Sequence, residues 1–184
     1  MKKIAANVVF TLAGGYIYSK SGLSDARAQS ATVLQALPQA RLLGTARLTV
    51  WGFAVYDARL WVNPDFQSAS YARSAFALEL TYLRNFEGKA IAERSLQEIR
   101  RQGSVDDAQA ARWLAALEAA IPDVRAGDRL LGVYQPASGV ALWHNGVADA
   151  SLGEPLLERR FMGIWLDPAT SEPTLRLRLL GQSP

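Results

Sequence analysis

The chain has 184 residues, enough for one domain of ordinary size with a real hydrophobic core. It contains no cysteine, which excludes disulfides and thiolate metal sites, and its 20 Lys plus Arg against 17 Asp plus Glu give a formal charge of only +3. No basic cluster alternates with aromatic residues, so we exclude nucleic-acid binding.

Residues 1–28 have the features of a signal peptide. Two lysines near the start precede a mostly apolar run over 4–18, and Ala-Arg-Ala at 26–28 is a small-residue cleavage site. The apolar run is too short and too interrupted for a membrane span. We therefore expect cleavage before Gln29, a mature domain over 29–184 that is formally neutral, and a periplasmic location. A disordered or membrane-apposed tail is the alternative.

The first half of the mature chain predicts strands. We expect two or three strands between Arg41 and Val62, with a bend or bulge at Gly52. Another strand is expected over 76–84, where large apolar residues alternate with smaller or polar ones. Over 47–61, apolar residues occupy both odd and even positions, which indicates strands that are covered on both faces.

Helical spacing follows over 88–102, with Ala92, Leu96 and Ile99 on one apolar stripe. Ser104 is the expected N-cap of a second helix, which ends before Pro122.

The last third returns to strands and then to helices. Residues 128–135 and 140–144 predict a hairpin, followed by a turn at Asn145-Gly146. Residues 154–166 predict a helix. The tail over 175–179 alternates like a strand, but its flanking serine, proline and glycine favour a helix. The resulting pattern is α+β, an antiparallel sheet with helices on one face, and such a layer can leave a cleft for a small apolar ligand.

Catalytic motifs are scarce in this sequence. His144 is the single histidine; it precedes a turn and has no metal-ligand spacing around it, so we interpret it as a turn residue. The sequence has no serine-nucleophile motif and no phosphate-binding glycine loop. We therefore expect no cofactor and no metal.

Polar residues within the apolar strands are the candidates for ligand binding. A buried arginine needs an acceptor, and a ligand carboxylate with a tyrosine or threonine hydroxyl beside it would supply one. The alternative is that the arginines reach solvent at strand ends and the tyrosines simply pack. The candidates are Arg41, Arg47, Thr49, Tyr56 and Tyr82.

Five segments together resemble the chalcone isomerase-like family of bacterial exported proteins. The resemblance covers roughly Arg41 to Gly181 and implies an open-faced β-sandwich, an antiparallel sheet packed by a layer of helices. The segments are RLTVWGFAVYDARLW (47–61), FALELTYLRNFEGK (76–89), PDVRAGDRL (122–130), HNG (144–146) and FMGIWLDPATSEPTLRLRLLG (161–181).

The resemblance also implies where a catalytic site would lie. Plant members of the fold close a flavanone ring, and their sites use an arginine, a strand threonine, a tyrosine, a lysine, an asparagine and a last threonine or serine. Here Thr49 is retained, and Arg41 is the candidate for the arginine. The remaining four positions are occupied by Ile91, Arg94, Glu98 and Ile164. An isoleucine cannot replace a phenol, so most of the isomerase site is substituted.

Three functions follow as hypotheses. The fold includes fatty-acid-binding members that hold a carboxylate with arginine and tyrosine, so the resemblance favours an exported, non-catalytic binder of a small amphipathic, fatty-acid-like ligand. The second hypothesis is an isomerase or intramolecular lyase acting on an unknown substrate, with polar roles for Thr49, Arg94 and Glu98. The third is a partner-binding module of the envelope. The sequence leaves the oligomeric state open.

Overall fold

Six strands form one antiparallel sheet in the order in which they occur in the chain. The computed structural model describes residues 32–183, so the signal peptide predicted over 1–28 lies outside the described residues. The strands are β1 (Arg41–Val50), β2 (Phe53–Val62), β3 (Phe76–Tyr82), β4 (Arg129–Gln135), β5 (Gly139–His144) and β6 (Val147–Ser151).

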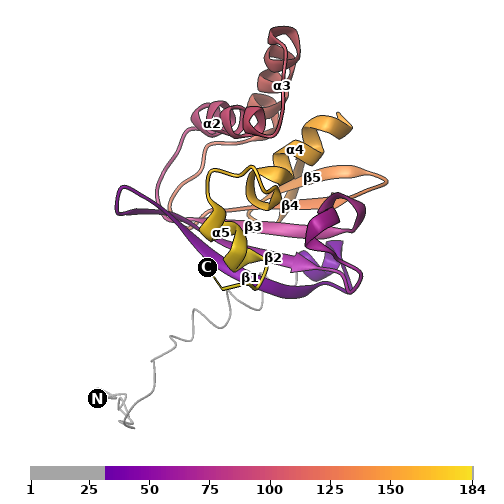
Figure 1. Ribbon diagram of the computed structural model, residues 1–184. Helices are drawn as coiled ribbons and strands as arrows, with labels where there is room; N and C mark the ends of the chain where they lie inside the picture. Colours follow the sequence, from indigo (N-terminus) through magenta and orange to yellow (C-terminus); the bar gives the residue numbers. More distant parts are fainter. Residues whose placement is uncertain (1–31, 184) are drawn as a thin grey trace, which may run out of the picture.

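Helices lie mainly on one face of this sheet (Figure 1). They are the 3₁₀ helix η1 (Ser68–Arg73), α2 (Gly88–Arg101), α3 (Asp107–Ala120), α4 (Pro155–Leu166) and α5 (Pro173–Leu179). Helix α4 packs on β4 and β5, α5 packs on β1 and β2, and α2 packs on α3 and α4. The predicted α+β architecture is confirmed.

The main core lies between the sheet and these helices. Leu60 pairs with Leu78 across β2 and β3, and both point into the core. The predicted stripe of α2 is buried there as well, with Ala92 and Ile99 fully covered. This side of the sheet therefore supplies the apolar surface on which a site can be built.

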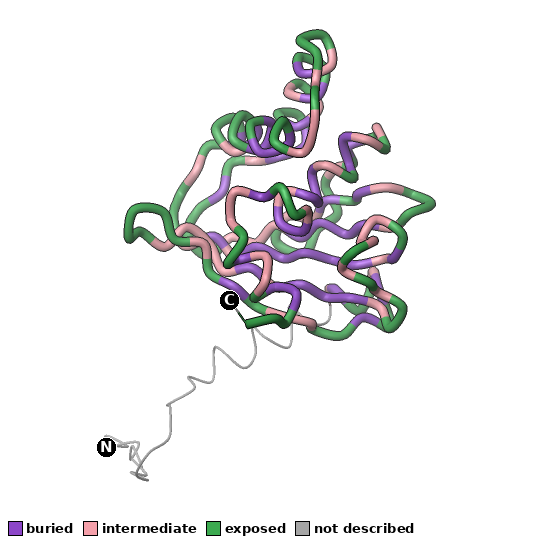
Figure 2. The backbone as a smooth tube through the Cα atoms, viewed as in Figure 1, coloured by how far each residue is buried: buried purple, intermediate pink, exposed green. Residues whose placement is uncertain are grey.

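A smaller hydrophobic cluster covers the other face of the sheet. Figure 2 shows the long buried stretches along the central strands. Val33 and Leu37, from a helical turn over 32–36 and the residue after it, pack near Trp61 and Leu131. Strands β2 to β4 are therefore covered on both sides.

The prediction of two covered faces for 47–61 is confirmed for the later part of β2. It is wrong over 47–53, where every residue except Leu48 is exposed.

Gly44 allows α5 to lie directly against β1. A Cβ atom at this position would collide with the backbone carbonyl oxygens of Arg178 and Leu179. Any side chain at position 44 would have to push α5 away from the sheet.

The structure corrects two details of the prediction. The N-cap of α3 is Asp106, not Ser104, because the Asp106 carboxylate accepts a 2.8 Å hydrogen bond from the Gln109 amide. Strand β6 was not predicted, since its five residues are mostly exposed and only weakly apolar. The tail forms the expected helix, α5. No helix within residues 32–183 has the length and apolar character needed to cross a bilayer.

Candidate functional site

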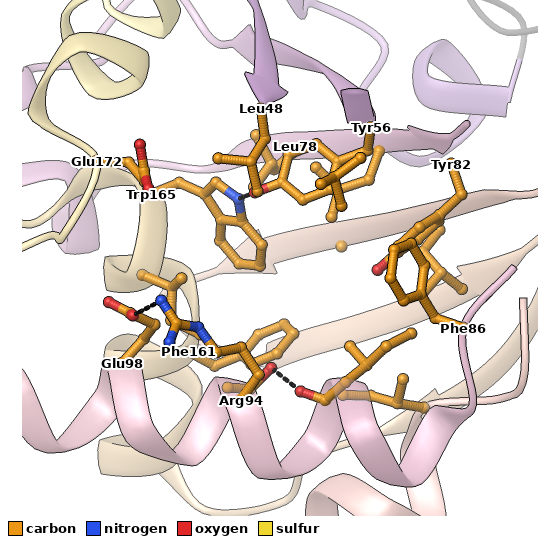
Figure 3. Close-up of a pocket in the computed structure, with 18 of the residues that line it drawn as sticks. Leu48, Tyr56, Leu78, Tyr82, Phe86, Arg94, Glu98, Phe161, Trp165 and Glu172 are labelled. Atoms are coloured by element: carbon orange, nitrogen blue, oxygen red, sulfur yellow. Dashed lines mark hydrogen bonds and ion pairs between the residues drawn. The ribbon is translucent and has the colours of Figure 1, made fainter. Parts of the chain in front are cut away.

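A cavity of about 540 Å³ lies between the helix-covered face of the sheet and the helices (Figure 3). Leu78 and Leu80 of β3 and Gly132 of β4 form its floor. Helix α2 forms one wall, and helix α4 with the start of α5 forms another. The strands follow one another in the sheet as a β-meander. The long connection between β3 and β4 carries α2, which lies over the cavity side of the sheet.

The lining is predominantly apolar and aromatic. Figure 3 shows Leu48, Leu78 and Tyr56 on the strand side and Tyr82 with Phe86 at one end. Phe161 and Trp165 project from α4 and meet edge to face, with ring centroids 5.6 Å apart. Such a surface is favourable for the hydrocarbon part of a ligand.

Tyr56 and Tyr82 add hydroxyl groups to this apolar lining. Their rings meet edge to face at 5.9 Å, and the Trp165 indole N–H donates a 2.9 Å hydrogen bond to the Tyr56 hydroxyl oxygen. Burial raises the pKa of both hydroxyls well above the ordinary value of 10.0. Both therefore remain protonated at neutral pH and can donate hydrogen bonds.

The Tyr82 hydroxyl has fewer hydrogen-bond partners than the Tyr56 hydroxyl. The side chain is buried, yet its hydroxyl makes no hydrogen bond to any residue within 32–183. An oxygen of a bound ligand, or water, is the partner such a group requires.

Charged groups gather along α2 at the opposite side of the cavity (Figure 3). Arg94 Nη2 lies 2.6 Å from Glu98 Oε1, and Arg101 Nε lies 3.7 Å from Glu98 Oε2. The Arg94 side chain is 64% exposed whereas that of Glu98 is 9% exposed. Arg94 therefore both lines the cavity and contacts solvent, and Glu172 adds a second carboxylate to the lining.

The structure brings some of the predicted site residues to the cavity and leaves others outside. Tyr56 and Tyr82 line it. Arg47 instead binds Asp57 with two hydrogen bonds of 2.7 and 2.9 Å on the exposed surface. Thr49 and Arg41 are exposed and do not line the cavity.

Strand alternation explains why Thr49 and Arg47 lie outside. Leu48 and Val50 point into the cavity, so the residues between and before them point to the opposite face. In contrast, all four substituted positions of the family comparison line the cavity: Ile91, Arg94, Glu98 and Ile164.

Sequence reasoning did not assign Trp165, Phe86 or Gly132 to the site. The hydrogen bond from Trp165 to Tyr56 joins residues 109 positions apart in the sequence. No local pattern could have paired them. Gly132 has no side chain, so its residue type gives no indication that it lines a cavity.

His144 lies outside the cavity, at the turn where it was predicted. Its Nε2 is 3.7 Å from Asp128 Oδ2 and 3.3 Å from the Asn145 amide nitrogen. No group of side chains in the described part of the chain has the arrangement of a metal site.

Comparison with known proteins gives three findings. The model of the chalcone isomerase-like family matches residues 28–181. An uncharacterized protein of Haemophilus influenzae is 28% identical over 144 residues, which are 77% of this chain and 68% of that protein.

The third finding is a solved structure, that of a fatty-acid binding protein of Arabidopsis thaliana. It superposes with a TM-score of 0.58 at 12% identity, over 77% of this chain and 87% of that chain. At this identity the likeness shows the fold, which is the one the sequence resemblance implied. Since the family model spans nearly the whole described chain, the protein belongs to the chalcone isomerase-like family.

Proposed function

We propose that this protein is a non-catalytic binder of a small amphipathic, fatty-acid-like ligand. The observation that carries the proposal is the apolar cavity of about 540 Å³ between sheet and helices. Small-molecule sites generally measure about 300–1,000 Å³ and combine apolar walls with a few polar groups. The Arabidopsis neighbour, whose fold is shared, is itself a fatty-acid binding protein.

The apolar walls would supply most of the affinity. Each methylene group of an acyl chain that leaves water contributes about 0.8 kcal/mol. An aromatic lining such as Phe86, Phe161 and Trp165 is well suited to such a chain, because it offers a large apolar contact area. The polar atom among these rings, the Trp165 indole nitrogen, already donates to the Tyr56 hydroxyl.

The chemistry of the cavity supports binding rather than catalysis. Ile91, an aliphatic residue, occupies the position at which plant members of the fold use a tyrosine. The two tyrosines that do line the cavity are held in the neutral form by burial, so neither offers a base at neutral pH.

Arg94 is the candidate for the head group. It is the arginine that lines the cavity, and a guanidinium has five N–H donors, so the bond to Glu98 leaves donors for a ligand carboxylate. The acyl chain would then extend along the sheet toward Tyr82 and Phe86.

Substitution Arg94→Gln is expected to weaken binding of a fatty acid about 10-fold, because it removes one partly solvent-exposed charge-assisted hydrogen bond. Binding of the fatty alcohol of equal chain length should change little, since that head group carries no charge. Isothermal titration with both ligands provides the measurement.

Arg101→Gln is the matched control for this substitution. Arg101 also contacts Glu98 but does not line the cavity, so this variant should bind both ligands like the parent protein. Equal losses for acid and alcohol in Arg94→Gln would show that Arg94 does not hold the carboxylate.

Native mass spectrometry of the purified protein tests the ligand class itself. We expect added medium-chain or long-chain fatty acid to appear as a bound species and to raise the melting temperature. Failure of every chain length to bind, together with unchanged melting, would contradict the proposal.

We further propose that the binder is exported, on the strength of the signal-peptide features of residues 1–28. Amino-terminal sequencing of protein from the periplasmic fraction should begin at Gln29. Recovery of the uncut chain from the cytoplasm alone would contradict export.

A further inference from the structure

The tip of the β1–β2 hairpin, residues Val50–Phe53, exposes apolar side chains to solvent. Trp51 is 93% exposed, Phe53 is 60% exposed and Val50 is 41% exposed. Figure 1 shows the hairpin projecting sideways beyond the helices, and Figure 2 shows its end coloured as exposed. No other large hydrophobic side chain in the described part of the chain is as exposed as this tryptophan.

The fold gains nothing from a tryptophan at position 51. Val50 pairs with Phe53, so Trp51 and Gly52 form a two-residue turn with φ values of +49° and +82°. A residue with a side chain at positive φ is strained, and turns of this kind favour Asn-Gly. Trp51 therefore contributes neither a favourable turn nor buried surface.

The same chain offers an internal comparison. At the β5–β6 hairpin, His144 pairs with Val147 across a two-residue turn with φ values of +50° and +87°. That turn is Asn145-Gly146, the favoured pair. Two turns with matching backbone φ values thus carry asparagine in one case and an exposed tryptophan in the other.

The hairpin tip is continuous with the cavity. Val50 and Trp51 line the cavity together with Leu48, so an apolar surface leads from the binding site to the exposed end of the hairpin. The Arg84 guanidinium lies 4.9 Å from the centre of the Phe53 ring, which places a positive charge beside the aromatic side chains.

We propose that the hairpin tip docks on the surface of a lipid bilayer, with Trp51 and Phe53 at the level of the head groups and Arg84 near their phosphates. The inference that the docked protein exchanges its amphipathic ligand with the bilayer rests on the proposed function. Tryptophan beside a cationic residue is the combination that proteins place at membrane–water interfaces.

A lipid surface fits this tip better than a protein partner does. A stable protein interface engages about 20–30 residues on each side, whereas the tip offers three apolar side chains. Shallow insertion of these side chains beside one positive charge would give a weak, reversible attachment, because binding to a membrane surface grows with the buried apolar area and with attraction to anionic lipids.

The test is co-flotation of lipid-stripped protein with vesicles of equal parts phosphatidylcholine and phosphatidylglycerol. We expect the parent protein to float with the vesicles and Trp51→Asn to partition about 10-fold more weakly. The melting temperature of Trp51→Asn should equal or exceed that of the parent, because the substitution creates the favoured Asn-Gly turn. The affinity loss then cannot be attributed to unfolding.

Val147→Asn is the matched control, since Val147 is 69% exposed beside the turn of the other hairpin. It should float like the parent protein. Equal flotation of Trp51→Asn and parent, no flotation of the parent, or concentration-dependent dimerisation that Trp51→Asn abolishes would each overturn membrane docking. Because the assay uses protein without ligand, its failure is distinguishable from failure of ligand binding by native mass spectrometry.

Discussion

Replacing Gly132 with leucine is expected to raise the dissociation constant for an acyl ligand about 100-fold while leaving the fold intact. Gly132 lies in the floor of the cavity on β4. A leucine side chain has four carbon atoms and would displace about as many ligand methylenes, each worth about 0.8 kcal/mol. The loss of about 3 kcal/mol corresponds to about two powers of ten in affinity.

The backbone position tolerates a side chain. A Cβ atom at position 132 would lie 3.4 Å from Met162 Sδ and 3.6 Å from Leu142 Cδ2, which are close to ordinary contacts with flexible side chains. Glycine within a strand is also unfavourable by about 0.5–1 kcal/mol relative to alanine. We therefore expect the melting temperature to be maintained.

Gly132→Ala is the graded control and should weaken binding by a factor of about 4, the loss of one methylene contact. Titration of the same fatty acid into both variants measures the series. Unaltered affinity in a folded Gly132→Leu variant would mean that the ligand, if bound, lies elsewhere.

Phe76→Ala is expected to produce the largest loss of stability, about 3–5 kcal/mol of the free energy of unfolding. Phe76 is fully buried and contacts the rings of Phe66, Tyr71 and Tyr134 at centroid distances of 5.8, 6.2 and 5.2 Å. Truncation would leave a void at the junction of η1, β3 and β4, and these surrounding rings cannot easily close it.

Chemical denaturation monitored by circular dichroism provides the measurement for Phe76→Ala. Phe53→Ala removes the same side chain from the exposed hairpin tip and should change the free energy of unfolding by about 0.5 kcal/mol or less. Comparable losses in the two variants would show that the ring cluster around Phe76 contributes little to stability.

Sequence patterns predicted most of the fold. The stripe of Ala92, Leu96 and Ile99 identified α2, because this helix buries one face. The run over 76–84 identified β3, which is buried on both faces over Phe76–Tyr82. Strand β6 was missed because it is an edge strand whose side chains are largely exposed, so burial leaves no pattern in its sequence. The N-cap of α3 was assigned wrongly because Ser104 and Asp106 are both residue types that favour this position, so the sequence alone does not decide between them.

The site was harder to predict than the fold. Thr49 lies at an odd position and Tyr56 at an even one, on two neighbouring strands. Only the register of β1 against β2, which shifts near Leu48, determines which face of the sheet each side chain occupies. The family comparison, by contrast, led to Ile91 and Arg94, which do line the cavity. Contacts between distant elements, such as that of Tyr56 with Trp165, arise only when the sheet and helices pack together.

The sequential strand order has a consequence for how the protein folds. Short turns join β1 to β2, β4 to β5 and β5 to β6, whereas a longer connection that carries η1 joins β2 to β3. Strands β3 and β4 must meet across the longest connection, the excursion that carries α2 and α3. Closing a long loop costs more entropy than closing a hairpin and slows the step that requires it. We therefore expect β1–β3 and β4–β6 to nucleate independently and the cavity between sheet and helices to be the last part of the molecule to form.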